Sequence, residues 1–435
     1  MSKVNINVEH LTRVEGHGNI LVNASNGKLE KVLWEVPEAP RYFEAFVKGK
    51  PYHQLAPITA RICGICSIGH ALTSLKATEQ ALGIEISDQD VLFRKLALHG
   101  ENMQSHVLHV GYLALPDLVG AGSVIPIVSS NPDEVKTVIR LHRLANEMST
   151  LMCGRTTHPR RLVPGGFSKI PSALELEELK GKLADSVEDL QAVASFVKSV
   201  ASGLPDFERE TEFISLVHDK EYPFYDGDII SSDGGTTPPE EYLSVTNEFV
   251  VPQSTAKYTK NKRDSYMVGA LARFNNNYDL LRPMAKEVAQ DFGLSPVCHN
   301  PYMNNVAQLV EIVHSVEDSI ALIDEILDKG IKEQGLYHIP DIKPKAGTGV
   351  GAVEVPRGIL FHEYTYDDNG ICTNANCIIP TNQNHANIQL DMEELVPNIL
   401  DKTEKEIELA LEMLVRAYDP CISCSTHYVD VKFKR

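Results

Sequence analysis

Two stretches of this sequence decide its fold: RICGIC, residues 61–66, and DPCISC, residues 419–424. Each carries two cysteines with C-x-x-C spacing, which lets two thiolates on one tight turn reach a common metal ion. The pairs lie 355 positions apart (421 − 66), so only tertiary folding can bring them together. Four soft thiolates suit nickel, iron or zinc, and we therefore expect one metal centre that joins both ends of the chain.

The composition narrows the class of protein. The chain has 435 residues, of which 43% are hydrophobic and 23% charged, as in globular proteins with a large core. Its net charge of −18 argues against a nucleic-acid partner. The polar N-terminus lacks the apolar core of a signal peptide, and no stretch approaches about 18 continuous apolar residues, so we expect no membrane insertion. Eight cysteines in such a chain favour reduced thiols and a cytoplasmic protein.

The periodicity of apolar residues predicts a mainly α fold. Alternation over residues 1–35, with Asn26-Gly27 as a turn, predicts a small N-terminal β-sheet with hairpins. Helical spacing or capping signals predict helices over residues 67–82, 87–115, 172–201, 304–329 and 403–418. Residues 219–240 and 338–357 read as irregular loops. Because the cysteine pairs must meet, we expect a single domain over residues 1–435, a large multihelical domain around a central helix bundle.

Three ordinary sites also use C-x-x-C pairs. A structural zinc site usually staples a small module whose pairs are tens of residues apart, unlike this chain. A redox disulfide motif would explain one pair but not two. An iron–sulfur cluster held by four cysteines is compatible with the spacing.

The G-x-G-x-G run at residues 347–351 is a weak nucleotide-binding signal, because no clear strand precedes it and no clear helix follows it.

The residues around the cysteines resemble the large subunit of [NiFe] hydrogenases over most of the chain. The cysteine motifs extend to His70 and His427, and three further motifs occur in the same order as in that family: RVEGHG at residues 13–18, EVPRG at 354–358 and IIPT-x-x-N at 378–384. The family more often has Ala where this chain has Val355. The related respiratory complex I subunit lacks the four cysteines and does not fit.

This resemblance implies a nickel ion bridged to an Fe(CO)(CN)2 unit. Cys63 and Cys421 match the terminal nickel thiolates, and Cys66 and Cys424 match the thiolates that bridge nickel and iron. Cys66 also precedes the predicted helix 67–82, whose positive end favours a thiolate.

Other positions match the family's proton path and the groups around the metals. Glu15 matches the carboxylate that relays the proton from Cys421, although a salt bridge with Arg13 is an alternative. Arg357 matches the guanidinium beside the metals, and Asp117 matches the carboxylate that holds this arginine. An ordinary buried ion pair is the alternative for Arg357, and a solvated carboxylate is the alternative for Asp117.

The resemblance assigns five more positions. Pro356 and Thr381 match residues that cradle the cyanides, and His70 matches a histidine near the bridging thiolate, where a core histidine is the alternative. Glu44 and His427 match ligands of a second metal ion, Mg2+ or Fe2+, for which Glu44 offers a hard oxygen donor. A surface role is the alternative for Glu44.

The implied reaction is H2 ⇌ 2H+ + 2e−, and it requires partners. With the four cysteines assigned to nickel and iron, no other cofactor site and no iron–sulfur cluster is expected in this chain, so electrons need an iron–sulfur small subunit together with further electron-transfer subunits. The sequence resembles the soluble cytoplasmic groups, whose acceptors vary among NAD(P), a deazaflavin, ferredoxin and a disulfide reductase. The alternatives are a hydrogen-sensing regulatory subunit or a non-catalytic zinc-stabilised scaffold.

The family also loses a C-terminal tail after the final histidine once nickel is in place. In this chain the tail would be residues 428–435. Two possibilities stay open: the sequence is the form before cleavage, or its subgroup keeps the tail.

Overall fold

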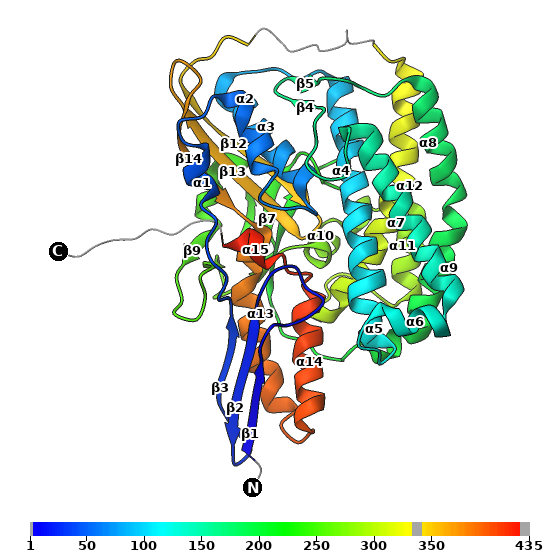
Figure 1. Cartoon of the computed structure of the whole chain (residues 1–435), viewed down its shortest axis with the longest axis vertical. Coiled ribbons are helices and arrows are strands. Elements are labelled where there is room, and N and C mark those ends of the chain that lie inside the picture. The colour runs from blue at the N-terminus through cyan, green and yellow to red at the C-terminus, as the bar shows by residue number, and fades with distance from the viewer. Residues whose placement is uncertain (1–2, 333–341, 427–435) are drawn as a thin grey trace, which may run out of the picture.

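The computed structural model describes residues 3–332 and 342–426 of the chain. A bundle of helices forms one side of the molecule, and small sheets with the remaining helices form the other (Figure 1). The predicted fold class, mainly α around a helix bundle with a small N-terminal sheet, is confirmed. None of the helices in the described part of the chain is both long and apolar enough to cross a membrane.

The helices fall into two groups (Figure 1). The bundle contains α4 (Asp88–Leu108), α7 (Pro132–Cys153), α8 (Ala173–Asp185), α9 (Val187–Val200), α11 (Pro283–Asp291) and α12 (Asn304–Lys329), with α5 (Leu115–Leu118) and α6 (Val124–Ser130) at one end. The remaining helices are α1 (Phe43–Val47), α2 (Tyr52–Thr59), α3 (Ser67–Leu82), α10 (Ala270–Asn277), α13 (Pro380–Asn398), α14 (Glu404–Ala417) and α15 (Ile422–Ser425).

The strands form small sheets. Two are antiparallel and three-stranded: β1 (Lys3–Val8), β2 (Asn19–Ser25) and β3 (Lys28–Glu35), and β12 (Gly347–Val355), β13 (Gly358–Tyr366) and β14 (Cys372–Ile378). A four-stranded sheet has the order β11 (Tyr266–Met267), β6 (Glu212–Val217), β7 (Asp228–Ser231), β8 (Gly235–Thr237), with β11 parallel to β6. Two-stranded pairs join β4 (Leu162–Val163) to β5 (Gly166–Phe167) and β9 (Asn247–Phe249) to β10 (Tyr258–Lys260).

Several helices predicted from the sequence are confirmed at one or both ends. Helix α3 ends at Gly83, whose φ of 66° is the left-handed cap typical of glycine. Helices α8 and α14 begin with capping boxes, Ser172 with Glu175 and Thr403 with Glu406. Helix α12 covers the predicted residues 304–329.

Other predicted elements are wrong in detail. The helix expected over 87–115 is α4 followed by a π-helical stretch, His109–Ala114, before α5. The helix expected over 172–201 is split into α8 and α9 at Ser186. The IIPT-x-x-N motif at 378–384, which resembles an active-site strand of the family, is a strand only up to Ile378, because Pro380 begins α13.

Both segments predicted as loops contain strands. Residues 219–240 include β7 and β8, and the preceding Tyr222, Phe224 and Tyr225 are buried, because this segment covers part of the core. Residues 347–355 of the second segment form β12, which is buried along most of its length. Residues 333–341 lie outside the described part of the chain.

Three alternate glycines of β12 allow it to lie directly on α3. A Cβ atom at Gly347, Gly349 or Gly351 would come within 2.1–2.3 Å of a backbone oxygen of α3. These are the glycines of the G-x-G-x-G run, so their role is close packing of a strand on a helix. Helix α3 is thereby fixed, and with it the cysteine segment at its N-terminal end.

Candidate metal centre

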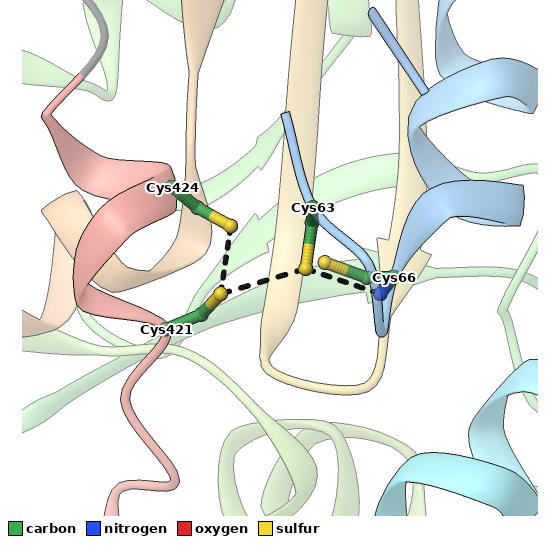
Figure 2. A group of neighbouring side chains, drawn as sticks. All are labelled: Cys63, Cys66, Cys421 and Cys424. Atoms are coloured by element: carbon green, nitrogen blue, oxygen red, sulfur yellow. Dashed lines mark hydrogen bonds between the residues drawn. The ribbon is translucent and has the colours of Figure 1, made fainter. Parts of the chain in front are cut away.

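The four cysteines of the two C-x-x-C pairs meet in the core (Figure 2). Their sulfur atoms lie within 4.8 Å of one another, and all four residues are buried. The Sγ atom of Cys421 is 3.5 Å from that of Cys63 and 2.7 Å from that of Cys424. All four cysteines are free thiols. The expectation that folding joins the two pairs is confirmed.

Helix α3 and its contact with α4 position the first pair. Cys66 is the N-cap residue of α3, and its backbone N–H donates to Cys63 Sγ over 3.2 Å. Glu101 on α4 accepts the N–H groups of Ile68 and Gly69, at 2.6 and 2.9 Å. This carboxylate satisfies the open end of α3 and ties the first cysteine segment to the bundle. The sequence motifs did not identify Glu101.

Residues from distant parts of the chain hold the second pair. After α14 the chain turns at Asp419, whose φ is 48°, and Cys421 is the N-cap residue of the short helix α15. The N–H of Cys421 donates to the hydroxyl of Thr381 over 3.0 Å, and the N–H of Ile422 donates to the carbonyl of Glu15 over 2.9 Å. The C-terminal pair is therefore fixed by α13 and by the N-terminal segment.

The four thiols, when ionised, favour the binding of metal cations between them. Hydrogen bonds from Cys421, Cys424 and Cys66 hold the pKa of Cys63 well below its usual value. Burial and the neighbouring thiols raise the pKa of Cys421 well above its usual value, and burial raises that of Cys424 to about 11. Four thiolates in so small a buried space repel one another unless metal ions offset their charge. The donor set therefore fits a soft metal centre.

Glu15 touches this cluster. Its Oε2 atom accepts from Cys421 Sγ and from the N–H of Ser423, each at 3.1 Å. Arg13, the alternative partner of Glu15, pairs with Asp117 instead. The structure therefore places the predicted carboxylate against a predicted metal ligand.

Arg357 lies beside the cysteines, but the acidic residue that holds it is Asp419. The Nε–H of Arg357 donates to the carbonyl of Asp419 over 2.6 Å, and its Nη2 donates to Oδ1 of the same residue over 2.7 Å. Burial opposes the charge of this guanidinium, but Asp419 and the thiols of Cys421, Cys66 and Cys63 raise the pKa of Arg357. A fixed cation therefore faces the sulfur atoms.

The expectation that Asp117 holds Arg357 is wrong. Asp117 pairs with Arg13 at 2.5 Å and with Arg416 at 2.7 and 3.0 Å. The reason is its place in the fold: Asp117 is on α5, where it meets Arg416 near the end of α14 and the N-terminal segment. Asp419 lies two residues after the end of α14, and it is the residue that accepts the hydrogen bonds of Arg357.

A second buried arginine, Arg273, fixes the turn that carries Arg357. Its guanidinium makes five hydrogen bonds: two to Glu311 (2.6 and 2.7 Å), one to Glu354 (2.8 Å), and one each to the carbonyls of Val355 and Pro356 (3.0 Å). All five N–H donors of the side chain are thus used. The sequence motifs did not identify Arg273, because nothing in its neighbourhood distinguishes it from a surface arginine.

The remaining predicted residues near the cysteines are buried. Pro356 is held through its carbonyl by Arg273, and Thr381 meets the backbone of Cys421 as described above. His70 lies on α3, where its Nδ1 is 3.2 Å from Nε2 of His362, which in turn hydrogen-bonds Tyr364.

Only half of the predicted second metal site lies in the described part of the chain. Glu44 on α1 is buried, and its Oε1 accepts the N–H of Cys377 over 2.8 Å. His427 and the tail 428–435 lie outside the described residues.

A model of the nickel-dependent hydrogenase family matches residues 41–139 and 236–427, which include both cysteine pairs. The chain belongs to this family. It is therefore a nickel-dependent hydrogenase large subunit, an oxidoreductase that acts on hydrogen.

Curated hydrogenase subunits align with nearly the whole chain. The chain is 34% identical over 429 residues to the alpha subunit of sulfhydrogenase 1 of Pyrococcus furiosus, covering 98% of each sequence. It is 33% identical to an F420-non-reducing hydrogenase vhu subunit of Methanococcus voltae, covering 94% of this chain and 99% of the relative.

Solved hydrogenase structures share the fold. An NAD+-reducing [NiFe]-hydrogenase in the H2-reduced state superposes with a TM-score of 0.86 at 28% identity, covering 97% of this hydrogenase and 99% of that chain. A [NiFeSe] hydrogenase variant from Desulfovibrio vulgaris Hildenborough gives a TM-score of 0.81 at 20% identity, covering 98% and 100% of the two chains, which supports the fold alone.

Proposed function

We propose that this chain is the catalytic subunit of a cytoplasmic [NiFe] hydrogenase that interconverts H2 with two protons and two electrons. One observation carries the proposal: four buried cysteines from both ends of a hydrogenase-family chain converge, with Glu15 and Arg357 against them. Their sulfur donors suit nickel and iron better than the hard ions that oxygen ligands select.

The cysteines have two roles in this proposal. Cys63 and Cys421 would hold nickel, and Cys66 and Cys424 would hold nickel and iron together. When bound, an Fe(CO)(CN)2-bridged nickel centre supplies the chemistry of heterolytic H2 cleavage. Pro356 and Thr381 would line the place of the cyanides. The hydroxyl of Thr381 is held near the cluster because it accepts the N–H of Cys421.

The chain itself moves the proton. The thiolate of Cys421 accepts one proton at its sulfur, and Glu15 Oε2 is 3.1 Å from that atom, within hydrogen-bond reach. Because Glu15 is only half-buried and the cysteines are buried, its carboxylate offers a route from the core toward the surface. We therefore assign Glu15 as the proton relay.

Arg357 acts electrostatically. Its two hydrogen bonds to Asp419 fix the plane of the guanidinium, so the positive charge is in place before the reaction begins. Asp117 acts further away, by holding Arg13 and Arg416. His70 acts through its contact with His362, which joins α3 to β13.

Electrons leave through a partner. We propose an iron–sulfur small subunit followed by further electron-transfer subunits, with no iron–sulfur cluster in this chain. The curated relatives are themselves named as individual subunits of hydrogenases. We also propose a second metal ion, Mg2+ or Fe2+, bound by Glu44 and His427, and removal of the tail 428–435 after nickel insertion.

Metal analysis and dye-linked turnover test the proposal. The purified protein should contain nickel and iron without zinc, and should reduce a viologen dye with H2. Cys63→Ser should lose both nickel and activity, because a hydroxyl is a poor ligand for nickel. Zinc as the sole metal would favour a structural scaffold, and nickel with negligible turnover would favour a hydrogen sensor.

A further inference from the structure

One arginine joins the two cysteine segments. The Nη2 atom of Arg41 donates to the carbonyl of Ile62 over 2.7 Å and to the carbonyl of Ser423 over 2.5 Å. Ile62 directly precedes Cys63, and Ser423 directly precedes Cys424. A single nitrogen therefore bonds the backbone beside one metal ligand of each pair.

Arg41 ends a short segment, residues 36–41, which we name the clasp. Besides the arginine side chain, the clasp makes two contacts with the C-terminal cysteine segment. The N–H of Arg41 donates to the carbonyl of Thr426 over 2.8 Å, and the hydroxyl of Ser423 donates to Oε1 of Glu38 over 2.7 Å. The clasp thus meets the second cysteine segment on both sides of Cys424.

The clasp is also held on its other side, by residues 253–255. The N–H of Thr255 donates to the carbonyl of Val36 over 2.9 Å, and the Thr255 hydroxyl donates to the carbonyl of Glu38 over 2.5 Å. The N–H of Val36 donates to the carbonyl of Gln253 over 3.2 Å. Two prolines, at positions 37 and 40, further restrict the backbone.

The guanidinium of Arg41 is also oriented. Its Cζ atom lies 5.3 Å from the centre of the Phe43 ring, a distance that allows a cation–π contact. The carbonyl of Ile62 also lies 3.6 Å from Cys424 Sγ, so the place where Arg41 binds is the contact between the two segments.

We propose that Arg41 is a positioning residue that sets the separation of the two cysteine pairs, and so the geometry and retention of the metals between them. This inference rests on the proposed function, since it concerns the nickel–iron centre. Arg41 acts through the backbone of Ile62 and Ser423. Removing it leaves the four thiols and the contacts of Cys421 and Ile422 in place, but removes the side-chain bonds that join the backbone before Cys63 to the backbone before Cys424.

The two bonds come from one nitrogen, which makes a conservative variant informative. The ammonium of Arg41→Lys has three N–H donors and can serve both carbonyls, although its side chain is one bond shorter. The Nε–H of Arg41 has no acceptor among the described residues, so its loss removes no bond. Lysine should therefore restore part of the function that methionine removes.

The experiment uses the assembled enzyme with its partner subunits and compares Arg41→Met, Arg41→Lys and the control Arg140→Met. Arg140 is a surface arginine on α7 that pairs with Asp189, so the control removes the same charge elsewhere. The measurements are nickel retained against a chelator over time, the electron paramagnetic resonance signal of oxidised nickel, and the thermal midpoint.

We expect Arg41→Met to lose nickel about tenfold faster than wild type, because groups that orient metal ligands are typically worth about 10–100-fold in metal affinity. Its nickel signal should shift, with Arg41→Lys intermediate and Arg140→Met unchanged. Equal thermal midpoints in wild type and Arg41→Met would show that the faster nickel loss does not come from general destabilisation. If the methionine variant does not assemble, Arg41→Gln replaces it.

Two results would overturn the inference: nickel loss and a nickel signal in Arg41→Met that match wild type, or equal acceleration in Arg41→Met and Arg140→Met. Neither result would affect the proposed function. That proposal would fail instead if the wild-type enzyme held no nickel or oxidised no H2.

Discussion

Glu15 is half-buried, and its carboxylate reaches the sulfur of Cys421. We expect Glu15→Gln to keep the metals and the fold, because the amide oxygen can still accept the N–H of Ser423. Without an ionisable group, turnover and H/D exchange with water should fall at least ~100-fold. Para–ortho conversion of H2 should survive better, and Glu15→Asp should give intermediate rates. Wild-type exchange in the fully metallated glutamine variant would rule out the relay.

The second prediction at the scale of residues concerns the two hydrogen bonds from Arg357 to Asp419. Arg357→Lys keeps the charge but loses the planar pair of bonds to the carbonyl and carboxylate of Asp419. Hydrogen oxidation should fall more than about tenfold at equal nickel and iron content, since one preorganised electrostatic group is worth several kcal/mol. Turnover near wild type would show that a point charge is sufficient.

Site residues could be predicted from the sequence where their spacing indicates a function. The cysteine pairs could be found this way, and resemblance located Glu15 and Arg357. The partner of Arg357 could not be found, because Asp117 and Asp419 are equally plausible until the ends of α5 and α14 are placed in space. Arg41 and Arg273 were missed for a related reason: an arginine reveals its importance only when its hydrogen-bond partners, distant in sequence, are known.

At the scale of elements, the contact between β12 and α3 offers a matched pair of substitutions. In Gly349→Ala the new Cβ would lie 2.3 Å from the carbonyl oxygen of Ala77, so strand and helix must separate. We expect a loss of about 1–3 kcal/mol in the free energy of unfolding. Nothing lies within 4 Å of a Cβ at Gly181 in α8, so Gly181→Ala should stabilise the chain by about 0.5–1 kcal/mol.

Urea unfolding of the two alanine variants against wild type measures both effects. Gly349→Ala should also weaken nickel binding, because α3 carries Cys66 at its N-terminal end. An unchanged urea midpoint in Gly349→Ala would mean that the strand moves away from the helix at little cost.

Helix ends were more predictable than strands. Capping boxes are local, so Ser172 and Thr403 could be identified from a few residues. The glycines of β12 suggested an irregular segment, since glycine usually weakens strands. The glycines are needed because β12 lies directly on the backbone of α3, which is distant in sequence. The break at Ser186 carries no glycine or proline and could not be predicted.

At the scale of the molecule, the largest hydrophobic cluster includes Val4, all four cysteines and residues from each long helix of the bundle. We therefore propose that residues 1–435 form one domain. Its unfolding in urea should give a single transition, with far-ultraviolet circular dichroism and tryptophan fluorescence changing together. Separate midpoints for the two signals would indicate independent units.

Buried His385 should make this domain sensitive to acid. The indole N–H of Trp34 donates to its Nδ1 over 3.0 Å, and its Nε2 lies 2.9 Å from the hydroxyl of Ser425. Burial lowers the pKa of His385 to about 3, against about 6.5 in the unfolded chain. The unfolded state therefore binds the proton first, so this stability is complete above pH 6.5 and is lost as the pH falls toward 3.

Replacing His385 by glutamine removes that titration. Between pH 7.5 and 5, wild type should lose about 2 kcal/mol more stability than His385→Gln, measured as the change in urea unfolding free energy at each pH. Equal losses in the two proteins would place the acid sensitivity elsewhere.

The distance in sequence between the cysteine pairs imposes an order in time. At about 5–20 residues per second, a ribosome that has made Cys66 needs about 20–70 s to reach Cys421, 355 positions later. Throughout that interval the nascent chain offers Cys63 and Cys66 without Cys421 or Cys424. A metal ion that arrives in this interval can bind only the first cysteine pair, and the site can close only after Cys424 has been made.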